Sequence, residues 1–434
     1  MAEGTGEQTY QAGSLVYNKR SLTKLFAWLL LGDFSMSVMA ITLAKLLPLH
    51  LEALGTQPGQ IGWMLSLGPL CSLLLSPFIG VWSDRLRTKW GRRRPFLIIS
   101  TPILAGGLLL IPHLTNLTIL TVVILIVQVA NVIETVVLYL YADVVPSRLM
   151  GRFMAGFKVV GILGGLAFTT LLFPIFDVAP TMVWTISALV YLVLYQLSLH
   201  MVREGKYDPP VEETKVQIVK DYVKDGLGSR YIWLLWLSLG MCALATPGGY
   251  FIDIFSKTEL GLDMKTIAHI NAWAMVPTLL IMIPGGWIMD KFGPRIIWSI
   301  FCFFHGVVLL AGYFWVKDAF TMQVFQVALA IVTSIHLLAL MPMLYAHLPV
   351  AKFGQLTSMQ SVIVQSMIFV SANVLGQIIQ YLGNDYRFAI LYGVPFFFLI
   401  PIFVHLLGRT PSPFKGMATA MDPHANSKPL SAAH

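Results

Sequence analysis

Apolar runs of roughly 20 residues recur along most of the chain, and they constrain its fold more than any other feature. A helical run of this length crosses a hydrocarbon core about 30 Å thick. We therefore predict an all-α membrane protein with twelve transmembrane helices. The predicted spans, called helix 1 to helix 12 in this section, are residues 25–51, 60–82, 96–113, 118–141, 153–176, 180–202, 231–254, 266–289, 296–316, 320–346, 355–381 and 387–407.

The composition agrees with this interpretation. Hydrophobic residues make up 56% of the chain, charged residues only 12%, and the mean hydropathy is +0.74, whereas an ordinary soluble domain carries about 25% charged residues. The first apolar run is too long for the core of a signal peptide, so we expect it to be retained.

The cysteines, Cys71, Cys242 and Cys302, form no metal-ligand pattern, and no metal site is predicted.

Positive charge indicates the orientation, because Lys and Arg accumulate in short cytoplasmic loops. If the N-terminus is inside, inner segments hold 23 of the 29 Lys and Arg residues. We therefore expect both termini to face the cytoplasm of a plasma membrane, or of the inner membrane if the chain is bacterial. This topology and contact with anionic membrane lipid explain the net charge of +8, so no nucleic-acid partner is expected.

Two loops carry related sequences, which indicates an internal duplication. The segment GVWSDRLRTKWGRRRPF at 80–96 is matched by GWIMDKFGPR at 286–295, and YADVVPSRLMGRFMA from 141 is matched by YAHLPVAKFGQLTSM from 345. The first match pairs Gly80 with Gly286, Asp84 with Asp290, Gly91 with Gly293, and Arg92 or Arg93 with Arg295. We therefore predict that six helices have been duplicated in parallel, which gives two six-helix bundles.

The predicted organisation has five parts. The two bundles occupy residues 25–202 and 231–407, and a linker at 203–230 contains Pro-Pro and a short amphipathic helix. Cytoplasmic segments at 1–24 and 408–434 complete the chain.

The pattern Gly-x-x-x-Asp-x-x-Gly-x-Arg in equivalent loops of two six-helix halves resembles the loop signature of the major facilitator superfamily, and the resemblance spans the whole chain. The first copy has four extra residues and closes as GRRRPF. This form resembles the plant sucrose transporters and their relatives, close to the glycoside-pentoside-hexuronide cation symporters. The segments LLPLHLEALG at 46–55 and IGWMLSLGPLCSLLLSPFIG at 61–80 resemble the same group.

The resemblance implies that these loops form a conformational latch. Asp84 would accept hydrogen bonds at the start of helix 11, and Asp290 would face helix 5 in the opposite arrangement. The alternative is that the charges serve only to orient the protein in the membrane. The residues assigned to the latch are Gly80, Asp84, Arg85, Gly91, Arg92, Arg93, Arg94, Gly286, Asp290, Gly293 and Arg295.

Ionisable residues within the spans are candidates for proton coupling, because each costs roughly 2.5–3.5 kcal/mol in the bilayer. Asp33, Glu134 and Lys158 lie at similar depth in helices 1, 4 and 5, which are neighbours in the family fold. They could neutralise one another in part and leave one carboxyl free to bind a proton. The alternative is a structural ion pair between Glu134 and Lys158.

Polar residues within the spans are candidates for binding a sugar, whose apolar face stacks on aromatic rings while its hydroxyls bond to amides. Gln128, Asn131 and Glu134 share one face of helix 4 because they are three residues apart. The remaining candidates are Tyr250, Asn271, Trp273, His336, Gln365 and Asn373.

The chain departs from the families that it resembles in its charged residues. Plant sucrose transporters carry an Asp in helix 4, in a segment similar to VQVANV at 127–132, and an Arg further along that helix. Here Gln128 takes the place of the Asp, and no Arg lies between Gln128 and Asp143. Helix 2 lacks the paired acids of melibiose-type sodium symporters. Either Asp33 or Glu134 replaces the missing carboxyl, or transport is passive.

These observations favour a transporter over the other function classes. We expect a monomeric secondary transporter for a sugar or glycoside, for example a disaccharide such as sucrose, that works by alternating access with the proton as coupling ion and no other cofactor. A passive facilitator and a drug–proton antiporter are alternatives, although GFKVVGILGGLAF at 156–168 lacks the Gly-Pro motif of such antiporters. An enzyme is not expected, since no nucleophile–base motif, metal cluster or phosphate loop is present. A non-transporting receptor would tolerate substitution of the polar residues within the spans.

Overall fold

The computed structural model describes residues 9–205, 226–349 and 352–414, apart from the side chains of residues 81, 84, 282, 283 and 290. Within these residues, eleven helical segments are long and apolar enough to cross a membrane. An additional helix, α11 (Met264–Phe292), lies where the eighth span is predicted. The predicted all-α membrane fold is confirmed.

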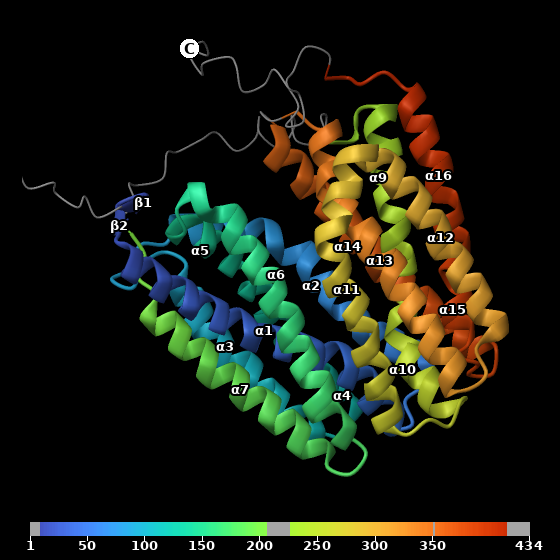
Figure 1. Ribbon diagram of the computed structural model, residues 1–434. Helices are drawn as coiled ribbons and strands as arrows, with labels where there is room; N and C mark the ends of the chain where they lie inside the picture. The colour runs from blue at the N-terminus through green and yellow to red at the C-terminus, as the bar shows by residue number, and fades with distance from the viewer. Residues whose placement is uncertain (1–8, 206–225, 350–351, 415–434) are drawn as a thin grey trace, which may run out of the picture. The chain divides into compact units, whose positions relative to one another are not determined.

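The first half of the chain begins with a small hairpin, in which Tyr10 pairs with Tyr17, and continues as helices (Figure 1). Its elements are β1 (Tyr10–Ala12), β2 (Leu15–Tyr17), α1 (Lys19–Ala53), α2 (Pro58–Arg85), α3 (Arg94–Leu110), η1 (Ile111–His113), α4 (Leu117–Glu134), α5 (Val136–Val144), η2 (Ser147–Leu149), α6 (Met150–Ala167), the π-helical turn η3 (Phe168–Leu172), η4 (Phe173–Ile175) and α7 (Pro180–Met201).

The second half is helical throughout the described residues. Its helices are α9 (Arg230–Ala245), α10 (Gly248–Thr258), α11, α12 (Pro294–Trp315), α13 (Ala319–His347), α14 (Phe353–Tyr381), α15 (Phe388–Tyr392) and α16 (Val394–Arg409).

Local sequence signals explain where the helices begin and where they are interrupted. Asn18 accepts a hydrogen bond from the backbone N–H of Ser21 and starts α1, as expected for an N-cap residue. Proline stands in the first turn of α2, α3, α7, α12 and α16, where its missing N–H costs no intrahelical bond. Three predicted spans are divided, at Thr135, at Pro247 and at Gly393.

Contacts group the chain into two compact units. The first comprises residues 1–212 and 262–272, and the second comprises residues 213–261 and 273–434. In the first unit α1 packs against α6 and α7, and α3 packs against α4 and α7; in the second, α12 packs against α13 and α16, and α9 packs against α14 and α16. Most of the predicted linker and tail lies outside the described residues, so the amphipathic linker helix stays a prediction.

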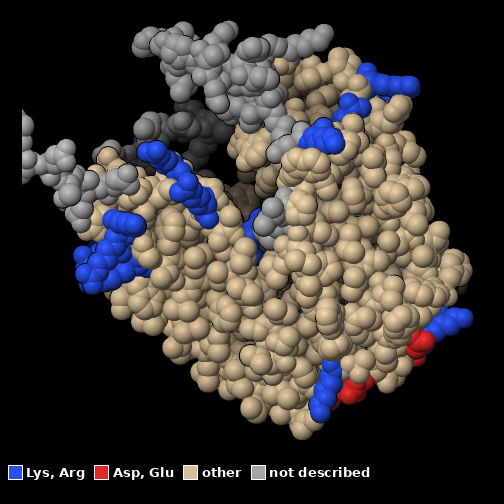
Figure 2. Space-filling view, viewed as in Figure 1, with Lys and Arg blue, Asp and Glu red and all other residues tan. Residues whose placement is uncertain are grey.

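The surface of the helices suits a lipid environment. Large apolar side chains such as Leu171, Phe320 and Phe78 are exposed, and exposed apolar area of this extent marks a surface that meets another apolar phase. Figure 2 shows Lys and Arg side chains gathered at the end of the first unit that holds β1, β2 and α5. The chain is therefore an integral membrane protein.

Candidate functional site

The basic loop between α2 and α3 forms a tight turn in the first unit. Thr88 and Gly91 exchange backbone hydrogen bonds of 3.2 and 3.1 Å, and the Thr88 hydroxyl donates to the Gly91 carbonyl at 2.7 Å. Gly91 has a φ of 109°, a backbone conformation that residues with a side chain rarely adopt. Gly293, its partner in the repeat, also has a positive φ, of 78°. The repeated glycine of the signature is therefore required by backbone geometry in both halves.

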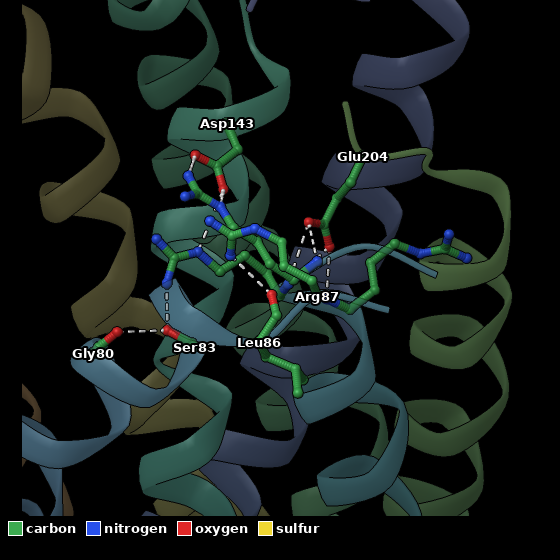
Figure 3. Close-up of polar contacts among 9 residues, drawn as sticks. Gly80, Ser83, Leu86, Arg87, Asp143 and Glu204 are labelled. Carbon is green, nitrogen blue, oxygen red and sulfur yellow. Dashed lines mark hydrogen bonds and ion pairs between the residues drawn. The ribbon is translucent and has the colours of Figure 1, made fainter. Parts of the chain in front are cut away.

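Glu204, just beyond α7, caps the start of α3 (Figure 3). Its carboxylate accepts hydrogen bonds from the backbone N–H groups of Arg92 at 2.8 Å, Arg93 at 3.0 Å and Arg94 at 2.7 Å. The first N–H groups of a helix have no intrahelical partner and carry partial positive charge, so a carboxylate is a favourable cap. A Cβ atom on Gly91 would lie 2.5 Å from Cδ of Glu204. Gly91 thus also provides the space that the cap occupies.

Asp143, at the end of α5, binds two arginines of the same loop. It accepts from Arg92 Nε at 3.0 Å and Nη2 at 2.5 Å, and from Arg93 Nε at 3.3 Å, as Figure 3 shows. Arg93 also donates from Nη1 to the Ser83 hydroxyl of α2. The carboxylate side chain is only 12% exposed, so these charge-assisted bonds are partly shielded from water. They hold α2, α5 and the start of α3 together.

The sequence prediction missed Asp143, Glu204 and Ser83. Asp143 lies in an inner segment whose other charged residues, Arg148 and Arg152, are basic, and orientation in the membrane gives no reason to place an acid there. That argument singled out Asp84 and applies equally to Asp143, whereas Glu204 lies in a linker that also holds several other acids. The side chains of Asp84 and Asp290 lie outside the described part of the chain, so their predicted contacts with the eleventh and fifth predicted spans, which correspond to α14 and α6, stay predictions.

The remaining latch residues lie at helix ends or in the last two turns of a helix. Arg85 is exposed in the last turn of α2, Gly80 lies near the Tyr139 hydroxyl, and Arg94 donates from Nε to the Leu199 carbonyl at 2.8 Å. In the second copy Gly286 lies in α11. The guanidinium of Arg295 lies against Gly408 of α16.

Glu134 is buried inside the first unit, with 1% of its surface exposed. Its Oε1 accepts from the hydroxyls of Ser100 at 2.7 Å and Thr101 at 3.1 Å, both on α3. Tyr191 and Tyr195 of α7, whose rings stack 5.4 Å apart, complete its surroundings. Among the described residues, no hydrogen bond of acceptable geometry reaches Oε2. The carboxyl group therefore has hydroxyl neighbours and no cation in the described structure.

Asp33 is the second buried carboxyl of this unit and is 3% exposed. It lies in α1 opposite Gly161 of α6, where a Cβ atom would lie 3.5 Å from Oδ2 of Asp33 and 3.2 Å from the hydroxyl of Ser37. Its Oδ2 has no hydrogen-bond partner within the described residues. Tyr141 of α5 lies within electrostatic reach of both Asp33 and Glu134, so the two carboxyls share one buried neighbourhood.

Lys158 is not brought together with these carboxyls as an ion pair. Its side chain is exposed, whereas Glu134 is buried against α3 and α7, and no ion pair joins Lys158 to Glu134 among the described side chains. Lys158 and Glu134 were predicted to lie at a similar depth in the membrane, but their side chains point in different directions around their helix axes. The suggested structural pair between Glu134 and Lys158 is therefore not formed in this structure.

Gln128 and Asn131 lie together on α4, as the three-residue spacing predicted. Asn131 Nδ2 donates to Gln128 Oε1 at 3.5 Å, and both side chains are half-buried. Gly68 of α2 leaves room for Gln128, since a Cβ atom there would lie 3.0 Å from its Oε1. Glu134, at the end of the same helix, contacts α3 and α7 instead.

The candidates of the C-terminal half have different surroundings. His336 is buried in the second unit against Trp298 and His305 of α12, with ring centroids 5.6 and 5.2 Å away; these contacts favour a packing role. Asn271, which groups with the first unit, accepts from Lys45 Nζ at 3.3 Å. The others differ in exposure: Trp273 is exposed, and Tyr250, Gln365 and Asn373 are half-buried.

Comparison with protein families identifies the relatives of this chain. The family model described as Major Facilitator Superfamily matches residues 27–314, which is more than half of the chain.

Curated relatives match over short stretches. A sucrose transport protein of Arabidopsis thaliana, SUC3, is 32% identical over 72 residues, 17% of this chain and 12% of that protein. Sucrose transport protein SUT4 of Oryza sativa is 37% identical over 59 residues, 14% of this chain and 10% of that protein. Proton-associated sugar transporter A of Homo sapiens is 36% identical over 78 residues, 18% of this chain and 10% of that protein.

Solved structures resemble the whole fold. The nucleoside transporter NupG has a TM-score of 0.70 at 12% identity, and the match covers 89% of this chain and 100% of that chain. An inward-facing bacterial homologue of the human lysosomal transporter Spinster has a TM-score of 0.71 at 14% identity, and the match covers 91% of this chain and 98% of that chain. At such identities the likeness concerns the fold alone.

Proposed function

The chain belongs to the major facilitator superfamily of membrane transporters, and we propose that it carries a sugar or glycoside by alternating access, coupled to protons. The short aligned stretches in sucrose transport proteins and in a proton-associated sugar transporter support a sugar as substrate. These stretches cover 12% or less of those proteins. Membership of the superfamily does not identify the substrate, and a sugar substrate is therefore our proposal.

The observation that carries proton coupling is the pair of buried carboxyls in the first unit. Asp33 and Glu134 are 3% and 1% exposed, and neither has a cationic partner among the described side chains. An ionisable group in a membrane span without a partner charge is costly and is retained where it serves a pathway or relay. Each carboxyl can exist as a neutral acid and give up its proton when access to water changes.

A transport assay with purified protein tests this proposal. The full chain is reconstituted into liposomes with an inward proton gradient, and uptake of radiolabelled sucrose, other disaccharides and monosaccharides is followed. We expect one sugar to accumulate above its external concentration and accumulation to collapse with a protonophore. Asp33→Asn should abolish accumulation while exchange of internal and external sugar persists, because the amide keeps the shape of the carboxyl group but cannot ionise.

The matched control is Asp318→Asn. Asp318 is an exposed N-cap of α13 that accepts a hydrogen bond from Thr321 N at 2.9 Å, and Asn is an equally good N-cap. Equilibration without accumulation by the unmodified protein would establish a facilitator instead, and proton-driven export of a lipophilic cation would establish an antiporter. Accumulation that survives in Asp33→Asn would transfer the coupling role to Glu134, which Glu134→Gln would then test.

The other proposed roles concern substrate and latch. The half-buried amides Gln128 and Asn131 are the first candidates for sugar hydroxyls, since their side chains already bond to each other. Asp84 and Asp290 are proposed to fasten the loops in alternate states, as in the superfamily. We also propose a monomer with cytoplasmic termini.

A further inference from the structure

The second unit holds a pocket at the start of α12, beside the latch residues Gly293 and Arg295. The pocket has a volume of about 660 Å³ and is lined by residues of the end of α11, the start of α12, the end of α13 and α16. Its polar side chains include Arg295, His347 and His405, and the residues that line it, all of them described, include no Asp or Glu. Charge and donors of this kind suit an anion.

The first unit shows what such a position can hold. There Gly91 and the start of α3 enclose the carboxylate of Glu204, three residues beyond the end of α7. The same count beyond α16 reaches Ser412, and no acidic residue occurs between Asp385 and Asp422. A Cβ atom on Gly293 would meet no atom within 4 Å. Within the described residues, the space that the protein's own carboxylate fills in one half is open in the other.

Packing fixes the cation at this pocket. The guanidinium of Arg295 lies against Gly408 of α16, and a side chain at position 408 would overlap the guanidinium. No carboxylate of the described residues forms an ion pair with Arg295. His347 bonds through Nδ1 to the Met343 carbonyl at 2.8 Å, which fixes its ring beside the pocket. A planar guanidinium held in this way suits bidentate binding of phosphate oxygens.

The walls of the pocket continue onto the apolar face of membrane-spanning helices. Ile296, Ile300 and Val404 line it, and Ile296 is 53% exposed. In Figure 2, Lys and Arg side chains appear at the end of the second unit where α9 and α16 meet, with no Asp or Glu beside them on the face shown. Arginine or histidine at a helix end, next to apolar side chains, matches a lipid with a charged head and acyl chains.

We propose that this pocket binds the phosphate of an anionic membrane phospholipid, with Arg295 and His405 on the phosphate oxygens and Ile296 and Ile300 along the first part of an acyl chain. The lipid supplies to α12 the negative charge that Glu204 supplies to α3. The same phosphate chemistry could come from free inorganic phosphate, but only a lipid uses the apolar walls.

Native mass spectrometry of the full chain tests the proposal. Purified protein is equilibrated with phosphatidylglycerol, with phosphatidylcholine, or with inorganic phosphate, and retained adducts are counted. We expect one phosphatidylglycerol to be retained preferentially, and Arg295→Gln to weaken its binding by about tenfold or more, as for loss of a charge-assisted bond. The matched control is Arg230→Gln, which removes an exposed Arg at the start of α9 that does not line the pocket.

Two further measurements keep the outcome decisive. Gly408→Ala should lower phosphatidylglycerol binding without removing a charge, because the methyl group displaces the guanidinium. Thermal melting of each variant in detergent shows whether it is folded. Equal loss in Arg230→Gln and Arg295→Gln, equal retention of the two lipids, or binding of inorganic phosphate with no retained lipid would overturn the proposal. The readout is lipid binding, so the result does not depend on whether the protein carries a sugar.

Discussion

In the first unit α3 begins beneath the carboxylate of Glu204, whereas in the second unit α12 begins at Gly293 beside an open, basic pocket. Both starts come from the same repeated signature, and both glycines have positive φ. The turn therefore requires glycine in both halves because of its backbone conformation. The residues around it determine whether the turn is closed by a side chain or left open.

The comparison teaches that duplication preserved the turn and changed its partners. Asp143 and Glu204 give the first unit a network of short charge-assisted bonds, while Arg295 has no carboxylate partner among the described residues of the second. The buried ionisable carboxyls that we propose for proton coupling are likewise in the first unit. We infer that the two halves have different roles, and that the ion pairs of the loop and the proposed proton-coupling carboxyls belong to the first half.

The largest expected effect is that of Asp143→Asn. The amide keeps the shape of the carboxylate but leaves Arg92 and Arg93 without their anion in a partly buried place. Breaking such a pair costs about 3 kcal/mol. We expect the free energy of unfolding, measured by titration with a denaturing detergent in mixed micelles, to fall by about that amount.

A control in the second unit sharpens the result. Arg295→Gln removes a guanidinium that has no ion pair in the described residues, and its effect on unfolding should stay below about 1 kcal/mol. Equal losses in the two variants would contradict the asymmetry between the halves.

Substituting the paired glycines gives the next effect. Gly91→Ala meets both an unfavourable φ and the carboxylate of Glu204, whereas Gly293→Ala meets an unfavourable φ alone. A residue with a side chain in the left-handed region costs about 1–2 kcal/mol. We expect a loss of about 2–3 kcal/mol for Gly91→Ala and about 1 kcal/mol for Gly293→Ala in the same unfolding titration, and a larger loss for Gly293→Ala would refute the comparison.

Much of the fold could be predicted from the sequence because its signals are local. Apolar runs, helix-starting prolines and the spacing of Gly80, Asp84 and Gly91 can all be found within short windows. The breaks at Thr135 and Pro247 were not predicted, because each apolar run was long enough to be assigned as one span. The second break could have been found in the sequence, since Pro247, Gly248 and Gly249 are residues that interrupt helices.

The site was predicted less completely because its contacts join distant residues. Arg92 and Glu204 are 112 positions apart, and no local pattern links them. Counting depth along the helices placed Glu134 and Lys158 at one level but could not determine the direction of each side chain around its helix. The rotation of each helix depends on packing against its neighbours, which a single sequence does not specify.

The smallest effect, and the most direct test of the contact itself, is the coupling between Gly91 and Glu204. In the unmodified chain Gly91→Ala is opposed by the φ of 109° and by the carboxylate, whose Oε1 and Oε2 would each lie 2.7 Å from the new Cβ. In a Glu204→Ala background the carboxylate is absent, and only the backbone term remains, so the cost should fall to that of Gly293→Ala. The double-mutant cycle in the same unfolding titration should therefore give a coupling of about 1 kcal/mol. Glu204→Ala alone should cost about 1–2 kcal/mol through loss of the cap. If Gly91→Ala cost the same in both backgrounds, the open pocket beside Gly293 could no longer be understood as the place of a missing carboxylate.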